Sequence, residues 1–140
     1  MPPLLVLPDN TVLINFARLK RMDLLARLAR HGAWCASVAD ECDRSAKMPG
    51  LEAMSDAHAI FGEPLRPENR VEHVMTQALR TRLARPGDAR LRHLGEAETL
   101  AIMSCRQLKG IFASDDSAVP VLAHEQGIRV VTTFDLLRVA

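Results

Sequence analysis

Hydrophobic residues in this chain occur in short uninterrupted runs, and longer stretches of mixed polarity separate these runs. The runs are Leu4–Leu7, Ala33–Ala36, Ile111–Ala113 and Val130–Val131. Uninterrupted apolar runs, as opposed to alternating ones, are typical of parallel strands that are buried on both faces. The pattern therefore predicts a short parallel sheet with helices packed on both of its sides.

The stretches between the runs have apolar residues at every third or fourth position, which is the spacing of a helix with one buried face. Residues that commonly cap helices, or that end them, set the expected boundaries. We expect helices that begin at Asn10 or Thr11, at Asp23, at Ser37 and at Phe134. We also expect helices that span Leu51–Ile60, Val71–Leu83 and Ala118–Gln126. A further helix should begin at Gly95 and end before Gly110.

The length and composition fit one globular unit. The chain has 140 residues, of which 48% are hydrophobic, so we expect a single α/β domain over residues 1–140. No apolar run approaches the roughly 20 residues that span a bilayer, and no basic leader precedes Leu4. We therefore expect a cytoplasmic protein without a membrane partner. The three cysteines form no CxxC pair, which argues against a disulfide framework or a structural zinc site.

Acidic residues follow the predicted strands or begin the predicted helices. Asp9 follows the first strand, Glu41 lies early in the third helix, and Glu96 and Glu98 lie in the first turn after Gly95. Asp115 and Asp116 follow the Ile111–Ala113 strand. Ligands of open parallel sheets bind beyond the carboxyl ends of the strands, where these side chains can meet.

Such a group of carboxylates is costly, because like charges repel, and a divalent cation removes that cost. Oxygen ligands favour Mg²⁺ or Mn²⁺, and such ions assist the hydrolysis of phosphodiesters. Each acidic residue alone has a simpler explanation as a helix cap or a solvated charge. The five histidines are scattered without metal-ligand spacing, and we expect each of them at the surface.

Four segments together resemble the PIN-domain nucleases, and in particular the VapC-like bacterial toxins. They are Leu5–Ile14, Ser37–Cys42, Leu94–Ala101 and Ala113–Asp116. Gly127–Phe134 also resembles the last strand and turn of the subgroup with a Gly-Glu-x-Glu motif. The resemblance implies a three-layer α/β/α sandwich around a short parallel sheet, and the activity of an endoribonuclease that depends on Mg²⁺ or Mn²⁺.

The resemblance also implies roles for individual residues. The catalytic set would be Asp9, Glu41, Glu98 and Asp115, with Glu96 as the alternative to Glu98. The metal ligands would be Asp9, Glu98 and Asp115 together with the adjacent Asp116, and Glu41 would bind metal or orient water. Toxins of this type act in type II toxin–antitoxin pairs, form homodimers, and are neutralised by a small antitoxin protein.

The charge balance of the chain conceals an uneven distribution. Lys and Arg total 18 and Asp and Glu total 17, but residues 66–92 contain seven Arg against Glu68, Glu72 and Asp88. Guanidinium groups bind phosphates, so a basic segment beside an acidic pocket suits an RNA substrate. The candidate RNA contacts are Arg18, Arg21, Arg82, Arg85, Arg90 and Arg92. The alternative is a solvated helix face, because Arg outnumbers Lys by 15 to 3 throughout the chain.

Two other functions remain open at this point. A PIN-like domain that has lost catalysis would serve as a protein- or RNA-binding module. A receiver-like signalling domain would need a Lys near the end of a late strand. Lys109 precedes its strand, which argues against that class.

Overall fold

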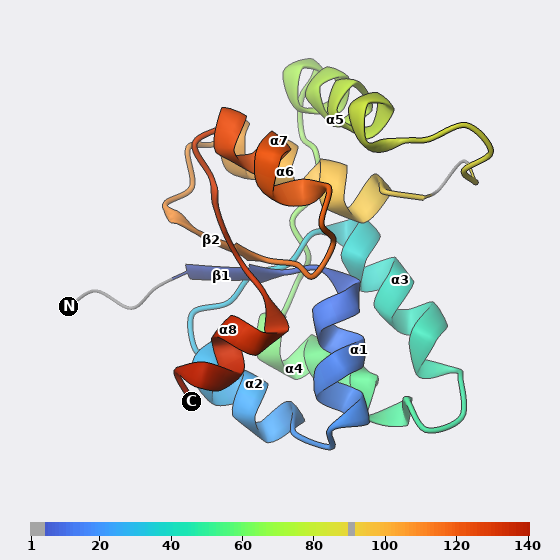
Figure 1. Ribbon diagram of the computed structural model, residues 1–140, viewed down its shortest axis with the longest axis vertical. Coiled ribbons are helices and arrows are strands. Elements are labelled where there is room, and N and C mark those ends of the chain that lie inside the picture. The colour runs from blue at the N-terminus through green and yellow to red at the C-terminus, as the bar shows by residue number, and fades with distance from the viewer. Residues whose placement is uncertain (1–4, 90–91) are drawn as a thin grey trace.

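Three short parallel strands form the centre of the protein, whose computed structural model describes residues 5–89 and 92–140 (Figure 1). The strands are β1 (Leu5–Pro8), β2 (Gly110–Ala113) and β3 (Arg129–Val131), in the order β1-β2-β3. The predicted runs at Ile111–Ala113 and Val130–Val131 are confirmed as strands, as is the run at Leu4–Leu7 from Leu5 onwards, since Leu4 lies outside the described residues; the strands pair in parallel as expected.

Helices cover both faces of the sheet, so the predicted three-layer α/β/α arrangement is confirmed. Val6, Ile111 and Ala113 face one core, whereas Leu7 and Phe112 face the other. The first core lies against α1 (Asn10–Arg18), α2 (Met22–Leu28), α3 (Ala36–Ala46), the 3-10 helix η1 (Glu52–Asp56), α4 (Ala57–Phe61) and α8 (Thr133–Arg138). The second lies against α5 (Arg70–Leu83), α6 (Leu94–Cys105) and α7 (Val119–Glu125) (Figure 1).

The predicted strand at Ala33–Ala36 is wrong. The segment makes single parallel bridges, from Gly32 to Val6 and from Cys35 to Leu65, and Ala36 already begins α3. Trp34 is fully buried, and its indole N–H donates a 2.7 Å hydrogen bond to the carbonyl of Gly62. Burial of Trp34 therefore explains the apolar run, which is an extended connection beside β1.

Helix α6 is the most buried helix of the fold, with every residue from Gly95 to Met103 inaccessible or nearly so. It packs between β2 and α5, and its first turn lies near α3. Among the described helices, none is both long and apolar enough to cross a bilayer. The placement of α6 brings its acidic first turn to the edge of the sheet where β1 and β2 end.

The register between β1 and β2 decides which residues meet at that edge. Pro8 pairs with Ala113, so Asp9 and Ser114 leave the sheet side by side. The amide of Asp9 donates a 2.8 Å hydrogen bond to the carbonyl of Ala113, which extends the pairing by one residue. The carboxyl edge therefore begins at Asp9 and Ser114.

An ion pair connects α5 to the end of α6. The guanidinium of Arg106 donates to both carboxylate oxygens of Glu72, at 2.8 and 3.0 Å, and to the carbonyl of Arg66. The side chain of Glu72 is 3% exposed. The hydrogen bonds from Arg106 lower the pKa of Glu72 from 4.5 to about 2, so this carboxylate stabilises the fold above pH 4.5.

We expect Arg106→Ala to destabilise the protein by roughly 3 kcal/mol, the low end for breaking a buried ion pair, because Glu72 is left buried without its partner. Guanidinium-induced unfolding at pH 7 measures the change. The wild type should lose this contribution as the pH falls from 4.5 towards 2, and the variant should have less to lose.

Arg82→Ala is the matched control, because Arg82 makes a similar two-point contact with Glu125 but at the surface. Exposed pairs contribute about 1 kcal/mol or less. If the two variants lose the same free energy of unfolding, burial does not make the Arg106–Glu72 pair more important for stability than the exposed pair.

Candidate metal centre

A pocket of about 250 Å³ opens at the carboxyl edge of the sheet. It lies where β1, α3, α6 and the loop after β2 come together. Its lining residues are Asp9, Asn10, Thr11, Glu41, Arg92, His93, Glu96 and Asp116. Four carboxylates from four separate segments of the chain therefore share one small space.

Asp9 is the most rigidly held of these carboxylates. It caps α1, with its Oδ1 accepting from the amide of Asn10 at 2.7 Å. Its Oδ2 accepts from the hydroxyls of Thr11 at 3.0 Å and Ser114 at 3.2 Å. Asp9 is 2% exposed, and this burial raises its pKa even though the three hydrogen bonds act in the opposite direction.

Glu41 reaches the pocket from α3 because α6 begins with a glycine on that side. A Cβ atom at Gly95 would lie 2.6 Å from Oε1 of Glu41. Burial raises the pKa of Glu41 to about 7, and the negative charge of Asp9 contributes to the shift. Gly95 thus leaves the space that the carboxylate of Glu41 occupies.

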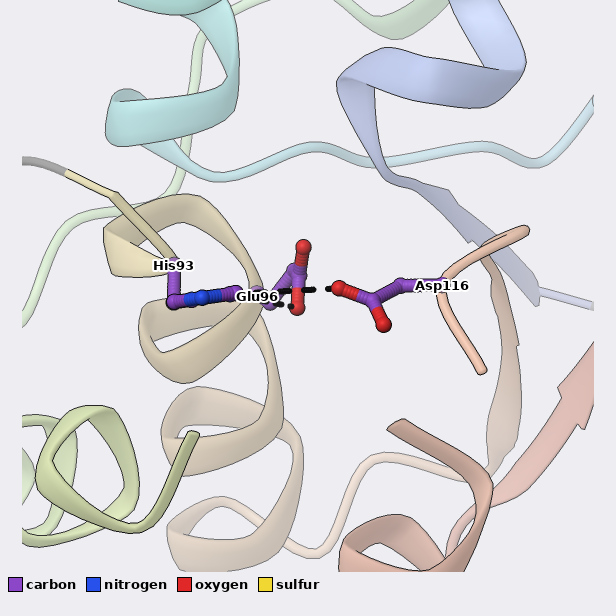
Figure 2. Close-up of side chains that lie close together, drawn as sticks. All are labelled: His93, Glu96 and Asp116. Atoms are coloured by element: carbon purple, nitrogen blue, oxygen red, sulfur yellow. Dashed lines mark ion pairs between the residues drawn. The ribbon is translucent and has the colours of Figure 1, made fainter. Parts of the chain in front are cut away.

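Glu96 lies in the first turn of α6 and has a strongly raised pKa. Burial raises its pKa to about 9, with further contributions from the charges of Asp9 and Asp116. Within the described part of the chain, no hydrogen-bond donor reaches its buried Oε2. Asp116 faces it from the loop after β2, where its Oδ1 accepts from the amide of Ala118 at 2.8 Å (Figure 2).

The expected place of Glu98 in this pocket is wrong. Two residues along a helix correspond to about 200° of rotation, so Glu98 and Glu96 point to opposite sides of α6. Glu98 instead accepts from the amide of Ser37 at 2.9 Å and from its hydroxyl at 2.8 Å. It therefore ties α6 to the start of α3, and the alternative, Glu96, holds the position in the pocket.

The expected place of Asp115 in the pocket is also wrong, whereas the adjacent Asp116 lines the pocket. Asp115 accepts from the amide and the hydroxyl of Thr133, and from the side chain of Asn15 at 2.7 Å. These bonds connect the loop after β2 to α8 and α1. Successive residues of this loop point in different directions, which separates the two aspartates.

Most of the described candidate RNA-binding arginines do not line the pocket. Arg92 lines it. Arg18 ends α1, and Arg21 follows it and pairs with Asp23, so both lie at the end of α1 that is remote from Asp9. Arg82 is engaged with Glu125, and Arg85 is exposed in the turn after α5. Arg90 lies outside the described residues.

His93 is the pocket residue that the sequence prediction missed. We expected every histidine at the surface, but the side chain of His93 is only 9% exposed and lies beside Glu96 and Asp116 (Figure 2). One local signal was present, since His93 precedes Glu96 by three residues and such pairs share a helix face. That spacing alone did not place the pair near Asp116.

Comparisons with known proteins add no assignment: the chain matches neither the models of known protein families nor any of the curated proteins.

These residues suit a divalent cation. The described His93, Glu96 and Asp116 each offer a ligand atom, and these atoms lie within 4.8 Å of one another. Asp9 and Glu41 add further oxygens to the same pocket. Burial of several carboxylates without enough donors is unfavourable, and a bound cation supplies the missing charge. The raised pKa values of Glu41 and Glu96 express this deficit.

The shortage of donors and positive charge around Glu96 predicts how the stability of the metal-free protein depends on pH. The folded pKa of Glu96 is about 9, above its unfolded value of 4.5, so its protonation stabilises the fold below pH 4.5. That contribution is lost as the pH rises from 4.5 to about 9. In the presence of a chelator, we expect Glu96→Gln to unfold several degrees above the wild type at pH 9 and near it at pH 5, in a thermal melt.

The exposed Glu63→Gln provides the control, with a pH profile that follows the wild type. If the unfolding temperatures of Glu96→Gln and the wild type change with pH in the same way, burial does not oppose the ionisation of Glu96, and the proposed shortage of compensating charge around it is contradicted.

The contact between Gly95 and Glu41 predicts that Gly95→Ala weakens Mn²⁺ binding by about tenfold, because the added methyl displaces the Glu41 carboxylate. Calorimetric titration measures the affinity. The same change in a Glu41→Ala background should have little effect, since the displaced group is already gone. An equal loss in both backgrounds would assign the effect to the backbone of α6 instead.

Proposed function

We propose that this protein is a metal-dependent endoribonuclease of the PIN type that hydrolyses phosphodiester bonds of RNA with Mg²⁺ or Mn²⁺. In this proposal Asp9, Glu96 and Asp116 hold the ion, and Glu41 binds it or orients the attacking water. Glu98 and Asp115 are positioning residues that hold α3, α6 and α8 around the pocket.

One observation supports the proposal above the others. Asp9, Glu41, Glu96 and Asp116 line one pocket at the carboxyl edge of a parallel sheet, with at least two carboxyl pKa values raised to about 7 and about 9. Strongly perturbed carboxylates gathered in a cleft are typical of functional sites. Their order along the chain is that of the acidic motifs whose resemblance to PIN nucleases the sequence suggests.

The residues around the pocket suit a phosphodiester substrate. A bound divalent cation would stabilise the charge that develops on the phosphate and lower the pKa of water. Asp9 needs no reorganisation, because Asn10, Thr11 and Ser114 already hold both of its oxygens. Arg92 is 65% exposed at the rim of the pocket, where its guanidinium can contact a neighbouring phosphate.

The remaining parts of the proposal concern partners and follow from the resemblance. They are a type II toxin that acts in the cytoplasm, a cognate antitoxin that blocks the pocket, and a homodimer. Exposed Val71 and Val74 on α5, beside Met75 and Ala78, provide an apolar surface that a second copy would cover.

The experiment is cleavage of a mixed RNA pool, containing transfer and ribosomal RNA and random single strands, in Mn²⁺, in Mg²⁺ and in chelator. We expect metal-dependent cleavage that Asp9→Asn and Glu96→Gln each lower by about 100-fold or more, because each removes a ligand. The unfolding temperature of Glu96→Gln should not fall, since this replacement removes a buried negative charge. That of Asp9→Asn should fall modestly, because the amide keeps only one of the two oxygens that accept from Asn10, Thr11 and Ser114, and circular dichroism checks that the fold persists.

Two matched variants separate the pocket from its surroundings. Asp40→Asn changes the exposed neighbour of Glu41 and should leave cleavage unchanged. Glu98→Gln should lower the unfolding temperature, because the amide cannot accept both bonds from Ser37 as well as a carboxylate does, while metal binding persists. Metal binding without any cleavage would favour the inactive binding module, and absence of metal binding would overturn the proposal.

A further inference from the structure

His93 occupies an unusual place at the start of α6. It is the residue before the first helical turn, a position where short polar side chains usually accept a backbone hydrogen bond. The side chain of His93 makes no such bond, and its backbone is left-handed, with a φ of 66°. The imidazole is instead directed into the acidic pocket, towards Glu96 and Asp116 (Figure 2).

The two ring nitrogens of His93 have different surroundings. Nε2 lies 3.2 Å from Oδ2 of Asp88, at hydrogen-bond distance. A carboxylate accepts hydrogen bonds, so with the ring proton on Nε2 the imidazole donates to Asp88, and Nδ1 then carries the lone pair. A carboxylate behind a histidine in this way is the usual arrangement for a metal-binding imidazole.

Nδ1 is the nitrogen that faces the pocket. It is buried, and within the described residues it has no hydrogen-bond partner, as is also true of Oε2 of Glu96. It lies 3.6 Å from that oxygen and 3.8 Å from Oδ2 of Asp116. Three groups that can each give an electron pair to a metal ion therefore converge on one point.

The spacing of these atoms suits a single ion. Bonds of about 2.1 Å place adjacent ligands about 3 Å apart and opposite ligands about 4 Å apart. The observed separations of 3.6 and 3.8 Å lie between these values, and all three ligand atoms are within 4.8 Å of one another. Small side-chain rotations are enough to close the set.

We propose that Nδ1 of His93 is a ligand of the ion in the acidic pocket, and that the site therefore takes Mn²⁺ or Co²⁺ in preference to Mg²⁺. This rests on the proposed function, because the carboxylates of that site supply the other ligands. Imidazole suits transition-metal ions, whereas Mg²⁺ keeps oxygen ligands and water. Asp88 is the positioning residue that orients the ring.

The first experiment detects the nitrogen directly in the wild-type protein. Mn²⁺ is added to the metal-free protein, and pulsed electron paramagnetic resonance measures the coupling of the ion to ¹⁴N. We expect a nitrogen coupling in the wild type, unchanged in His124→Ala, which alters an exposed histidine on α7, and absent in His93→Ala. Bound Mn²⁺ without nitrogen coupling in the wild type would overturn the proposal while leaving the carboxylate site intact.

The second experiment compares affinities by calorimetric titration. His93→Ala should weaken Mn²⁺ and Co²⁺ binding by about tenfold or more and Mg²⁺ binding by less than about threefold. Equal losses for all three ions would assign His93 a structural role and overturn its role as a ligand. If the wild type binds none of these ions, or if Asp9→Asn leaves their binding unchanged, the proposed function fails as well. This outcome differs from bound Mn²⁺ without nitrogen coupling and from equal losses for all three ions, which overturn only the role of His93.

Discussion

The repulsion among buried carboxylates at the end of the sheet is the constraint on which the rest of this structure depends. Asp9, Glu41, Glu96 and Asp116 meet in one pocket, where their side chains are partly or largely buried, and the pKa values of Glu41 and Glu96 rise as a consequence. A folded chain tolerates such an arrangement only if the surrounding contacts hold it together. The β1–β2 register and the buried helix α6 provide those contacts.

Acidic residues that neighbour the pocket carboxylates supply much of that support. Glu98 accepts two hydrogen bonds from Ser37 and thereby connects α6 to α3. Asp115 accepts from Thr133 and Asn15 and thereby connects the loop after β2 to α8 and α1. The first turn of α6 and the loop after β2 thus each contain one carboxylate that faces the pocket and another that holds two elements in place. The second kind accepts its hydrogen bonds from Ser37, Thr133 and Asn15.

The positive charges are divided in a similar way. Arg106 and Arg82 connect helices through Glu72 and Glu125, so their guanidinium groups are already engaged. Arg92 lies at the rim of the pocket. Within the Arg-rich segment of residues 66–92, Arg82 thus serves to join α5 to α7, so the count of Arg in the sequence overstated the positive surface beside the site.

The sequence by itself determined the layers of the fold, because uninterrupted apolar runs and helical spacing depend on local burial alone. It also determined that acidic residues would gather at the carboxyl edge, since each follows a strand or begins a helix. Only the tertiary structure decided between Glu96 and Glu98 and between Asp115 and Asp116, because the rotation of α6 and the path of one loop are set by packing against α3 and α8. The same holds for Ala33–Ala36, whose burial comes from Trp34 and not from a strand, and for His93. Its nitrogen meets Asp116 only because α6 and the loop after β2, distant in sequence, pack against the same edge of the sheet.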